Sequence, residues 1–217
     1  VDISMREKGK RPFQRLLDAG LVNASHLAVH AVHMNEDEIA RFAEAGVSVA
    51  HCPNSNLKLA SGIAPISSYR RAGVNVSLGT DGAASNNMLD LFAEMRTTAL
   101  LAKATSGDAS VVTASEALHM ATIGGARALG LEDRIGSIEA GKHADLTCVD
   151  LNRLHSQPVY DVLSQIVYAA LSDQVTDVWV AGRHQLDKGR FNHRYTDYML
   201  ARASEWSERI APTGEIQ

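Results

Sequence analysis

Short apolar runs alternate with helical stretches along the first half of this 217-residue chain, and this alternation constrains the fold more than any other feature. A buried strand in a parallel sheet is typically a short apolar run bounded by helices and turns. Strand-to-helix alternation predicts βα units and a parallel sheet. The predicted strands are residues 26–33, 47–50 and 74–78, with a shorter one at 56–59.

Helix start and stop signals separate these strands. Asn35 followed by Glu38 has the spacing of a capping box, and Gly46 is a typical helix end. Pro residues at helix starts and Gly residues after helix ends predict two more helices. These are residues 12–19, closed by Gly20, and 65–71, closed by Gly73.

Three of the predicted strands end in a side chain that can bind a metal ion. His33 and His51 end the first two, and Asp81 follows the third within the turn Gly79-Thr80-Asp81-Gly82. The carboxyl ends of parallel strands meet at one edge, where sites of α/β proteins form. Neutral imidazole and carboxylate groups are zinc ligands. The sequence therefore predicts a metal site built from these strand ends.

Each of these residues also has a structural interpretation. Glu36, three residues after His33, can shuttle protons at a metal site or simply complement a helix dipole. Either histidine alone is more often structural than a ligand, and an aspartate in such a turn can bond its own backbone. Coincidence of all three strand ends is less expected than coincidence of one. His30 is assigned to packing or to support of the site.

The second half of the chain changes from α/β alternation to a β-rich pattern. Helices are predicted at 88–104 and from the capping box Thr113-Ala114-Ser115-Glu116 to about Leu129, and a terminal helix with a loose tail follows from residue 195. Short β-like segments lie at 144–149, 175–181 and 184–186. We predict a barrel portion at 1–135, a small β-sandwich unit at 136–190, and a helix with a tail at 191–217.

Composition excludes several functional classes. A net charge of −4, a pI near 6.1 and the lack of a Lys/Arg block argue against a nucleic-acid surface. No apolar run approaches the roughly 20 residues of a membrane helix. The two cysteines, Cys52 and Cys148, form no disulfide framework and predict a cytoplasmic protein. Neither a Gly-x-Ser-x-Gly elbow nor a phosphate-binding loop is present.

Several motifs together resemble a known family. They are Val29-His30-Ala31-Val32-His33-Met34-Asn35-Glu36, His51-Cys52-Pro53-Asn54-Ser55-Asn56, Gly79-Thr80-Asp81-Gly82-Ala83-Ala84-Ser85-Asn86-Asn87 and Gly136-Ser137-Ile138-Glu139-Ala140-Gly141-Lys142. They resemble the amidohydrolase superfamily and, within it, the 5′-methylthioadenosine/S-adenosylhomocysteine deaminases. The fold implied is α/β: the second half of a metal-dependent (β/α)₈ barrel plus part of a small flanking β-sandwich.

The resemblance also implies roles for individual residues. His33 and Asp81 match metal ligands, and the metal implied is one Zn²⁺ per subunit, with Fe²⁺ or another divalent ion as alternatives. Glu36, His51 and Asp81 match groups that contact substrate and take part in catalysis. The implied reaction is hydrolytic deamination of an adenine ring to the inosyl product and ammonia, in which Asp81 and His51 aim the attacking water and Glu36 protonates a ring nitrogen.

One departure from the family pattern is large. The family has a His-x-His pair at the end of its first strand, a further histidine on its fourth and an upstream arginine, and no matching segment occurs here. A full barrel takes roughly 250 residues, and the chain starts with Val1 without an initiator Met or a signal peptide. We expect a C-terminal portion of a longer deaminase that is inactive in isolation.

Other functions stay open. A guanine, 8-oxoguanine or triazine hydrolase has the same fold, and a catalytically dead scaffold subunit would keep the barrel half without stoichiometric zinc. The resemblance implies a small nucleoside substrate and a homo-oligomer, either a dimer or a tetramer. The charge and the lack of a long apolar run predict no nucleic-acid and no membrane partner.

Overall fold

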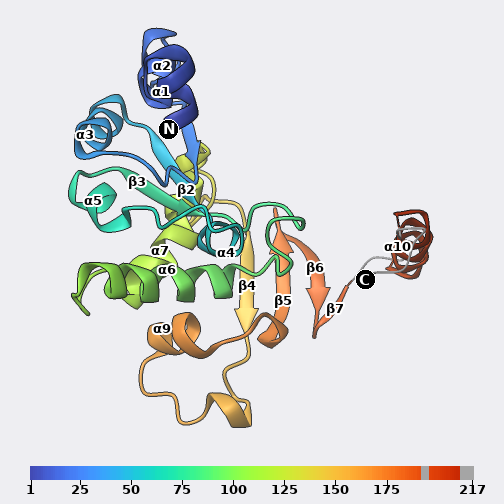
Figure 1. The fold of residues 1–217 in the computed structure, drawn as a ribbon. Helices are drawn as coiled ribbons and strands as arrows, with labels where there is room; N and C mark the ends of the chain where they lie inside the picture. Colours follow the sequence, from blue (N-terminus) through green and yellow to red (C-terminus); the bar gives the residue numbers. More distant parts are fainter. Residues whose placement is uncertain (192–195, 211–217) are drawn as a thin grey trace.

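A computed structural model describes residues 1–191 and 196–210 of the chain. Two sheets organise it, one parallel and one antiparallel, with helices around the first (Figure 1). The elements of the first half are α1 (Asp2–Lys8), α2 (Pro12–Asp18), β1 (Leu27–Val29), α3 (Glu36–Ala45), β2 (Ser48–His51), α4 (Pro53–Lys58), α5 (Ile66–Arg71) and β3 (Asn75–Leu78).

The second half begins with three helices and continues into the antiparallel sheet. Its elements are α6 (Leu91–Ser106), α7 (Ala114–Ala121), α8 (Ile123–Ala128), β4 (Leu146–Val149), a 3₁₀ turn (Leu154–Ser156), α9 (Val162–Ser164), a π-helical turn (Gln165–Ala169), a second 3₁₀ turn (Ser172–Gln174), β5 (Val175–Val180), β6 (Arg183–Asp187), β7 (Arg190–Phe191) and α10 (Thr196–Ile210).

The first sheet is parallel, as the alternation predicted. Its order is β1-β2-β3, with Leu27 opposite Ser48 and Ser48 opposite Asn75. Helix α3 connects β1 to β2, and α4 and α5 connect β2 to β3, so the chain forms successive βα units (Figure 1). The three strands therefore end at the same edge, where side chains from different loops meet.

Apolar residues of these strands and helices form one core. Val49 and Val76 of the sheet are buried with Ile39 and Phe42 of α3 and with Tyr69 of α5. The predicted capping box of α3 is confirmed, since Asn35 accepts from the Glu38 amide and the Glu38 side chain accepts from the Asn35 amide. These contacts fix the helix against the sheet and set the direction of the loop before it.

The first predicted strand is shorter than expected. We expected it to run to His33, but β1 ends at Val29. The backbone turns immediately afterwards, with positive φ angles of 65° at His30 and 43° at Ala31. The Tyr69 hydroxyl donates to the Ala31 carbonyl and holds this turn. His33 therefore lies beyond a turn, four residues after the strand end.

Residues 56–59 were expected to form a short strand, and this prediction was wrong. They lie in and just after α4, which begins at Pro53. Proline suits the first turn of a helix because its missing N–H would have no helical partner there. The Asn56 amide then donates to the Cys52 carbonyl, which starts the helical pattern.

The helix expected from residue 113 to about Leu129 is two helices. The predicted capping box of Thr113 and Glu116 starts α7, but the chain bends at Thr122 (φ −121°, ψ −98°) and resumes as α8. Helix α6 begins later than the expected residue 88, because the Asp90 side chain caps it by accepting from the Phe92 amide.

The second sheet is antiparallel with the order β4-β5-β6-β7. The expected β-like segments correspond to β4, β5 and β6. Helix α10 buries no residue and stands apart from both sheets (Figure 1). Tyr195 and the expected tail at 211–217 lie outside the described residues. Within the described residues, none of the helices combines the length and the apolar run needed to cross a bilayer.

Candidate metal centre

Asp81 lies three residues beyond the end of β3, and its carboxylate is held by three hydrogen bonds. Ser55 and Ser85 donate their hydroxyls to Oδ2 at 2.7 and 2.6 Å, and the Gly82 amide donates to Oδ1 at 2.8 Å. The bonds from Ser85, Ser55 and Gly82 lower the pKa of Asp81 to about 2. The φ angle of 61° is left-handed, a conformation that aspartate tolerates better than most residues. Asp81 is therefore an ionised carboxylate with a fixed orientation.

His51 is the last residue of β2 and is almost completely buried, with 2% of its surface exposed. Burial and, second, the charge of His30 lower its pKa to about 4. Its Nδ1 atom is buried without a hydrogen-bond partner among the residues described. At neutral pH this is an uncharged imidazole whose free nitrogen can serve as a ligand or accept a proton.

The structure brings His30, rather than His33, next to Asp81. His30 Nε2 lies 3.8 Å from Asp81 Oδ2, and its Nδ1 is buried without a partner in the described residues. The turn after β1 directs His30 this way. Sequence reasoning assigned His30 to packing or support, and the left-handed backbone at His30 and Ala31 has no clear signal in the sequence.

His33 lies in the same cavity as His30. This cavity of about 240 Å³ is lined by both histidines and by Ser55 of α4. The His33 carbonyl accepts a hydrogen bond of 2.6 Å from Arg11, which also pairs with both carboxylate oxygens of Glu38. The backbone of His33 is therefore fixed, although the residue is exposed.

Glu36 begins α3 and is exposed. Its Oε1 accepts a hydrogen bond of 2.9 Å from the Ser68 hydroxyl of α5. The structure gives it no direct contact with Asp81 or His51. Only the other oxygen of the Glu36 carboxylate is free to act on a substrate.

A buried carboxylate that sequence reasoning missed ties the two site loops together. Glu94 of α6 is fully buried and accepts from the Asn54 amide (3.2 Å), the Asn54 side chain (3.0 Å) and the Asn86 side chain (2.6 Å). Asn86 also donates to the Thr80 carbonyl, next to Asp81. Glu94 thus links the loop after His51 to the loop that carries Asp81.

Helix α4 supplies a second link to the Asp81 loop. Ser55 bonds Asp81 directly, and Lys58, one turn later, donates to the Ala84 carbonyl and to Asn87. The neighbouring Cys52 is buried, and burial followed by the charges of Asp81 and Glu94 raises the pKa of its thiol to about 11. Cys52 is therefore a protonated thiol.

The donor set at this mouth fits a metal such as zinc. It combines an ionised carboxylate with imidazole side chains, and two of these, His30 and His51, have a buried nitrogen without a partner in the described ranges. The set is incomplete, however. Within residues 1–191 and 196–210, the group of three His, Cys, Asp or Glu side chains with ligand atoms within 4.8 Å of one another is on the second sheet, at Asp177, His184 and Asp187.

Comparison with known proteins decides the family. Residues 3–184 match the Amidohydrolase family. The chain belongs to the amidohydrolase family. The parallel sheet and the antiparallel sheet are therefore both parts of an amidohydrolase fold, which confirms the predicted α/β class.

Two curated relatives within this family are similar to the chain, and both have the name of a deaminase. The chain is 46% identical over 210 residues to a 5-methylthioadenosine/S-adenosylhomocysteine deaminase of Teredinibacter turnerae, covering 97% of this chain and 48% of that protein. It is 53% identical over 181 residues to a protein of the same name from Moorella thermoacetica, covering 83% and 42%. This amidohydrolase chain therefore spans about half the length of the curated relatives it matches.

Solved structures agree with the fold. An adenosine deaminase from Xanthomonas campestris with bound zinc superposes with a TM-score of 0.94 at 53% identity, covering 96% of this chain and 48% of that one. An atrazine chlorohydrolase from Arthrobacter aurescens complexed with zinc gives 0.88 at 31% identity, covering 94% and 45%.

Proposed function

We propose that this chain is the second half of the catalytic barrel of a zinc-dependent enzyme that hydrolytically deaminates the adenine ring of 5′-methylthioadenosine or S-adenosylhomocysteine. The observation that carries the proposal is the ionised Asp81 carboxylate, fixed at the strand ends beside His30 and near the neutral His51. The names of the relatives at 42–53% identity support the substrate class. The zinc in the Xanthomonas campestris structure supports the metal.

Asp81 and a histidine of the β1 loop would hold the metal. His33 is the histidine assigned by family resemblance, and His30 is the one nearest to Asp81 in the structure. A zinc ion, when bound, supplies Lewis-acid activation of a water molecule. The remaining ligands would come from the half of the barrel that this chain does not contain.

Asp81, His51 and Glu36 would each have a separate part in the reaction. The Asp81 carboxylate, ionised at neutral pH, accepts a proton from the attacking water. His51 stays neutral and orients that water through its unpaired Nδ1. Glu36, anchored by Ser68 through one oxygen, uses the other to carry a proton to a ring nitrogen. Protonation makes the ring carbon electrophilic, and the water oxygen adds to it. The proton held by Asp81 then passes to the amino group, the C–N bond breaks and ammonia leaves. The remaining hydroxyl proton returns to Glu36 as the C=O bond forms.

The test is turnover of methylthioadenosine by a protein with a complete barrel, followed as loss of the adenine absorbance band, together with metal content. Asp81→Asn should lower turnover by roughly 100-fold or more, since even the loss of an outer partner of a metal ligand costs about 10–100-fold. Asp133→Asn, at an exposed aspartate, is the matched control and should leave turnover unchanged. Equal turnover in Asp81→Asn and the control would refute the assignment.

A second candidate is hydrolysis of a triazine. The likeness to the atrazine chlorohydrolase, at 31% identity, favours it less than the 42–53% identity to deaminases. Consumption of a chlorotriazine without loss of the adenine band would select this candidate. Neither reaction, with no stoichiometric zinc, would select a catalytically dead scaffold.

A further inference from the structure

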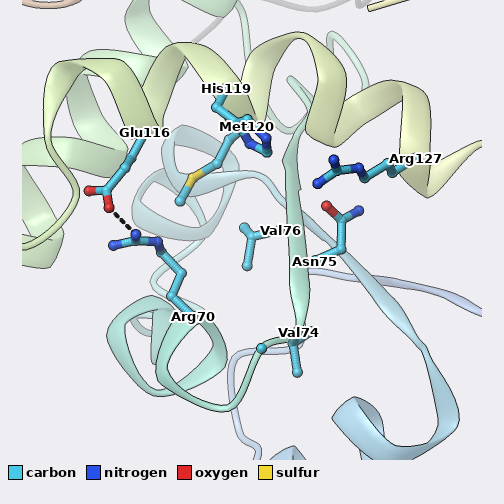
Figure 2. A pocket seen from close by; sticks show the side chains of 9 residues that line it. Arg70, Val74, Asn75, Val76, Glu116, His119, Met120 and Arg127 are labelled. Carbon is cyan, nitrogen blue, oxygen red and sulfur yellow. Dashed lines mark hydrogen bonds and ion pairs between the residues drawn. The ribbon is translucent and has the colours of Figure 1, made fainter. Parts of the chain in front are cut away.

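A second hollow, away from the metal centre, lies at the opposite end of β3. It has a volume of about 380 Å³ and opens between the end of α5, the start of β3 and the helices α7 and α8 (Figure 2). Its lining includes Gly73 and Val74, just before β3, whereas Asp81 follows the other end of that strand. The proposed reaction uses none of its residues.

The side chains around this hollow carry more positive than negative charge. Arg70 forms an ion pair with Glu116. Glu116 is also engaged by α7, since it accepts from the Thr113 amide at 2.7 Å and the Thr113 hydroxyl at 3.0 Å. The Arg127 side chain has no hydrogen-bond or ion-pair partner within residues 1–191 and 196–210. The hollow therefore has two guanidinium groups but one carboxylate, which already pairs with Arg70.

His119 lies between these charges and adds a neutral donor. Burial, then the positive charges of Arg127 and Arg70, lower the pKa of its imidazole. Both guanidinium groups therefore affect the His119 imidazole, although only Arg70 has an ion-pair partner among the described residues. In the view of Figure 2, Arg127 and the Arg70–Glu116 pair lie on opposite sides of Val76, with His119 above.

The floor of the hollow is apolar. Val76 and Met120 line it and are buried, with 4% and 3% of their surfaces exposed. A purely inorganic ion would leave this surface without a contact. A ligand with a charged head and a compact apolar body would satisfy both the unpaired guanidinium and the floor.

We propose that this pocket binds a small organic oxyanion, a carboxylate or phosphate group on a compact apolar body, with Arg127 as its main partner and Val76 and Met120 beneath its apolar part. Guanidinium groups bind such oxyanions through paired, charge-assisted hydrogen bonds. Arg70 and His119 complete the polar side. This site is independent of the metal centre and of the proposed deamination.

The test is calorimetric titration of the purified protein with phenyl phosphate and with benzoate. We expect saturable binding with a dissociation constant of about 1 mM or tighter, and at least a tenfold weakening in Arg127→Gln. The matched control is Arg71→Gln, which removes the same charge from an exposed arginine of α5 outside the pocket. It should change the affinity less than twofold.

Comparison of the two ligands distinguishes a phosphate head group from a carboxylate. Tighter binding of phenyl phosphate assigns a phosphate, and tighter binding of benzoate assigns a carboxylate; either supports the site. No saturable binding, or an equal loss in Arg71→Gln and Arg127→Gln, would overturn it. Inorganic phosphate binding as tightly as phenyl phosphate would overturn the role of the apolar floor. Asp81→Asn should leave all of these affinities unchanged, so failure of the proposed deaminase function does not affect this result.

Discussion

At the scale of single residues, His51 should make the protein sensitive to acid. Its folded-state pKa of about 4 lies below the ordinary histidine value of 6.5 because burial disfavours the charged ring. Above pH 6.5 both folded and unfolded states are neutral, and the stabilisation is fully present. As the pH falls from 6.5 to about 4, only the unfolded state takes up the proton. The free energy of unfolding should then fall by roughly 3 kcal/mol in all.

Denaturant unfolding of the metal-free protein across this pH range measures the effect. His51→Gln should remove most of the pH dependence, because glutamine does not titrate. His155→Gln, at an exposed histidine, is the control and should keep the wild-type slope. A His51→Gln variant with the wild-type slope would show that another group is responsible.

Sequence reasoning identifies residues that end strands better than residues that act through tertiary contacts. Asp81 and His51 follow apolar runs, so their position at the carboxyl ends of the strands could be predicted. Glu94 could not, because a carboxylate in an amphipathic helix gives no sign that it will be buried against Asn54 and Asn86. The contact of His30 with Asp81 depends on a left-handed turn of non-glycine residues, which local sequence rarely indicates.

At the scale of elements, the two adjacent glycines that follow the bend at Thr122 should respond oppositely to alanine. A Cβ on Gly124 would lie 2.9 Å from the Val76 carbonyl oxygen and 3.0 Å from that of His119. Both neighbours are backbone, so Gly124→Ala should destabilise the protein by roughly 1–3 kcal/mol. Gly125 has only the Met120 carbonyl oxygen near, at 3.9 Å. Gly125→Ala should be neutral or stabilising by up to about 1 kcal/mol.

Urea unfolding of the two variants gives the comparison directly. Each variant is the control for the other, because both add one methyl group to the same short helix. Destabilisation of both by the same amount would mean that helix α8 does not approach β3 as closely as the structure has it.

Elements with local end signals were predicted, and elements set by distant contacts were not. The capping boxes at Asn35 and Thr113 start helices as expected. The break between α7 and α8 was not predicted, since Thr122, the residue that leaves the helical conformation, is not a helix breaker by type. Helix α4 was mistaken for a strand because four residues are too few for hydrophobic periodicity to separate the two.

At the scale of the whole molecule, the parallel sheet has three strands, whereas a (β/α)₈ barrel has eight. Strands β1 and β3 each have one edge without a partner strand among the described residues. The metal donors follow the same division, since Asp81 and the histidines of the β1 loop do not make a complete zinc site. A closed barrel and a full set of zinc ligands would both require strands beyond these three.

The proposed function predicts that this chain becomes active when the remaining strands of a barrel are supplied. We expect the 217-residue chain alone to hold less than stoichiometric zinc and to show no measurable deamination. A fusion in which the first half of the Xanthomonas campestris adenosine deaminase precedes this chain should bind zinc and deaminate methylthioadenosine, because the two proteins are 53% identical over the shared half. Zinc content and loss of adenine absorbance measure both effects.

The same fusion with Asp81→Asn is the control and should lose turnover, which shows that this chain contributes to the site. Turnover by the chain alone at the rate of the fusion would contradict the incomplete ligand set, and a zinc-loaded fusion without turnover would contradict the proposed substrate.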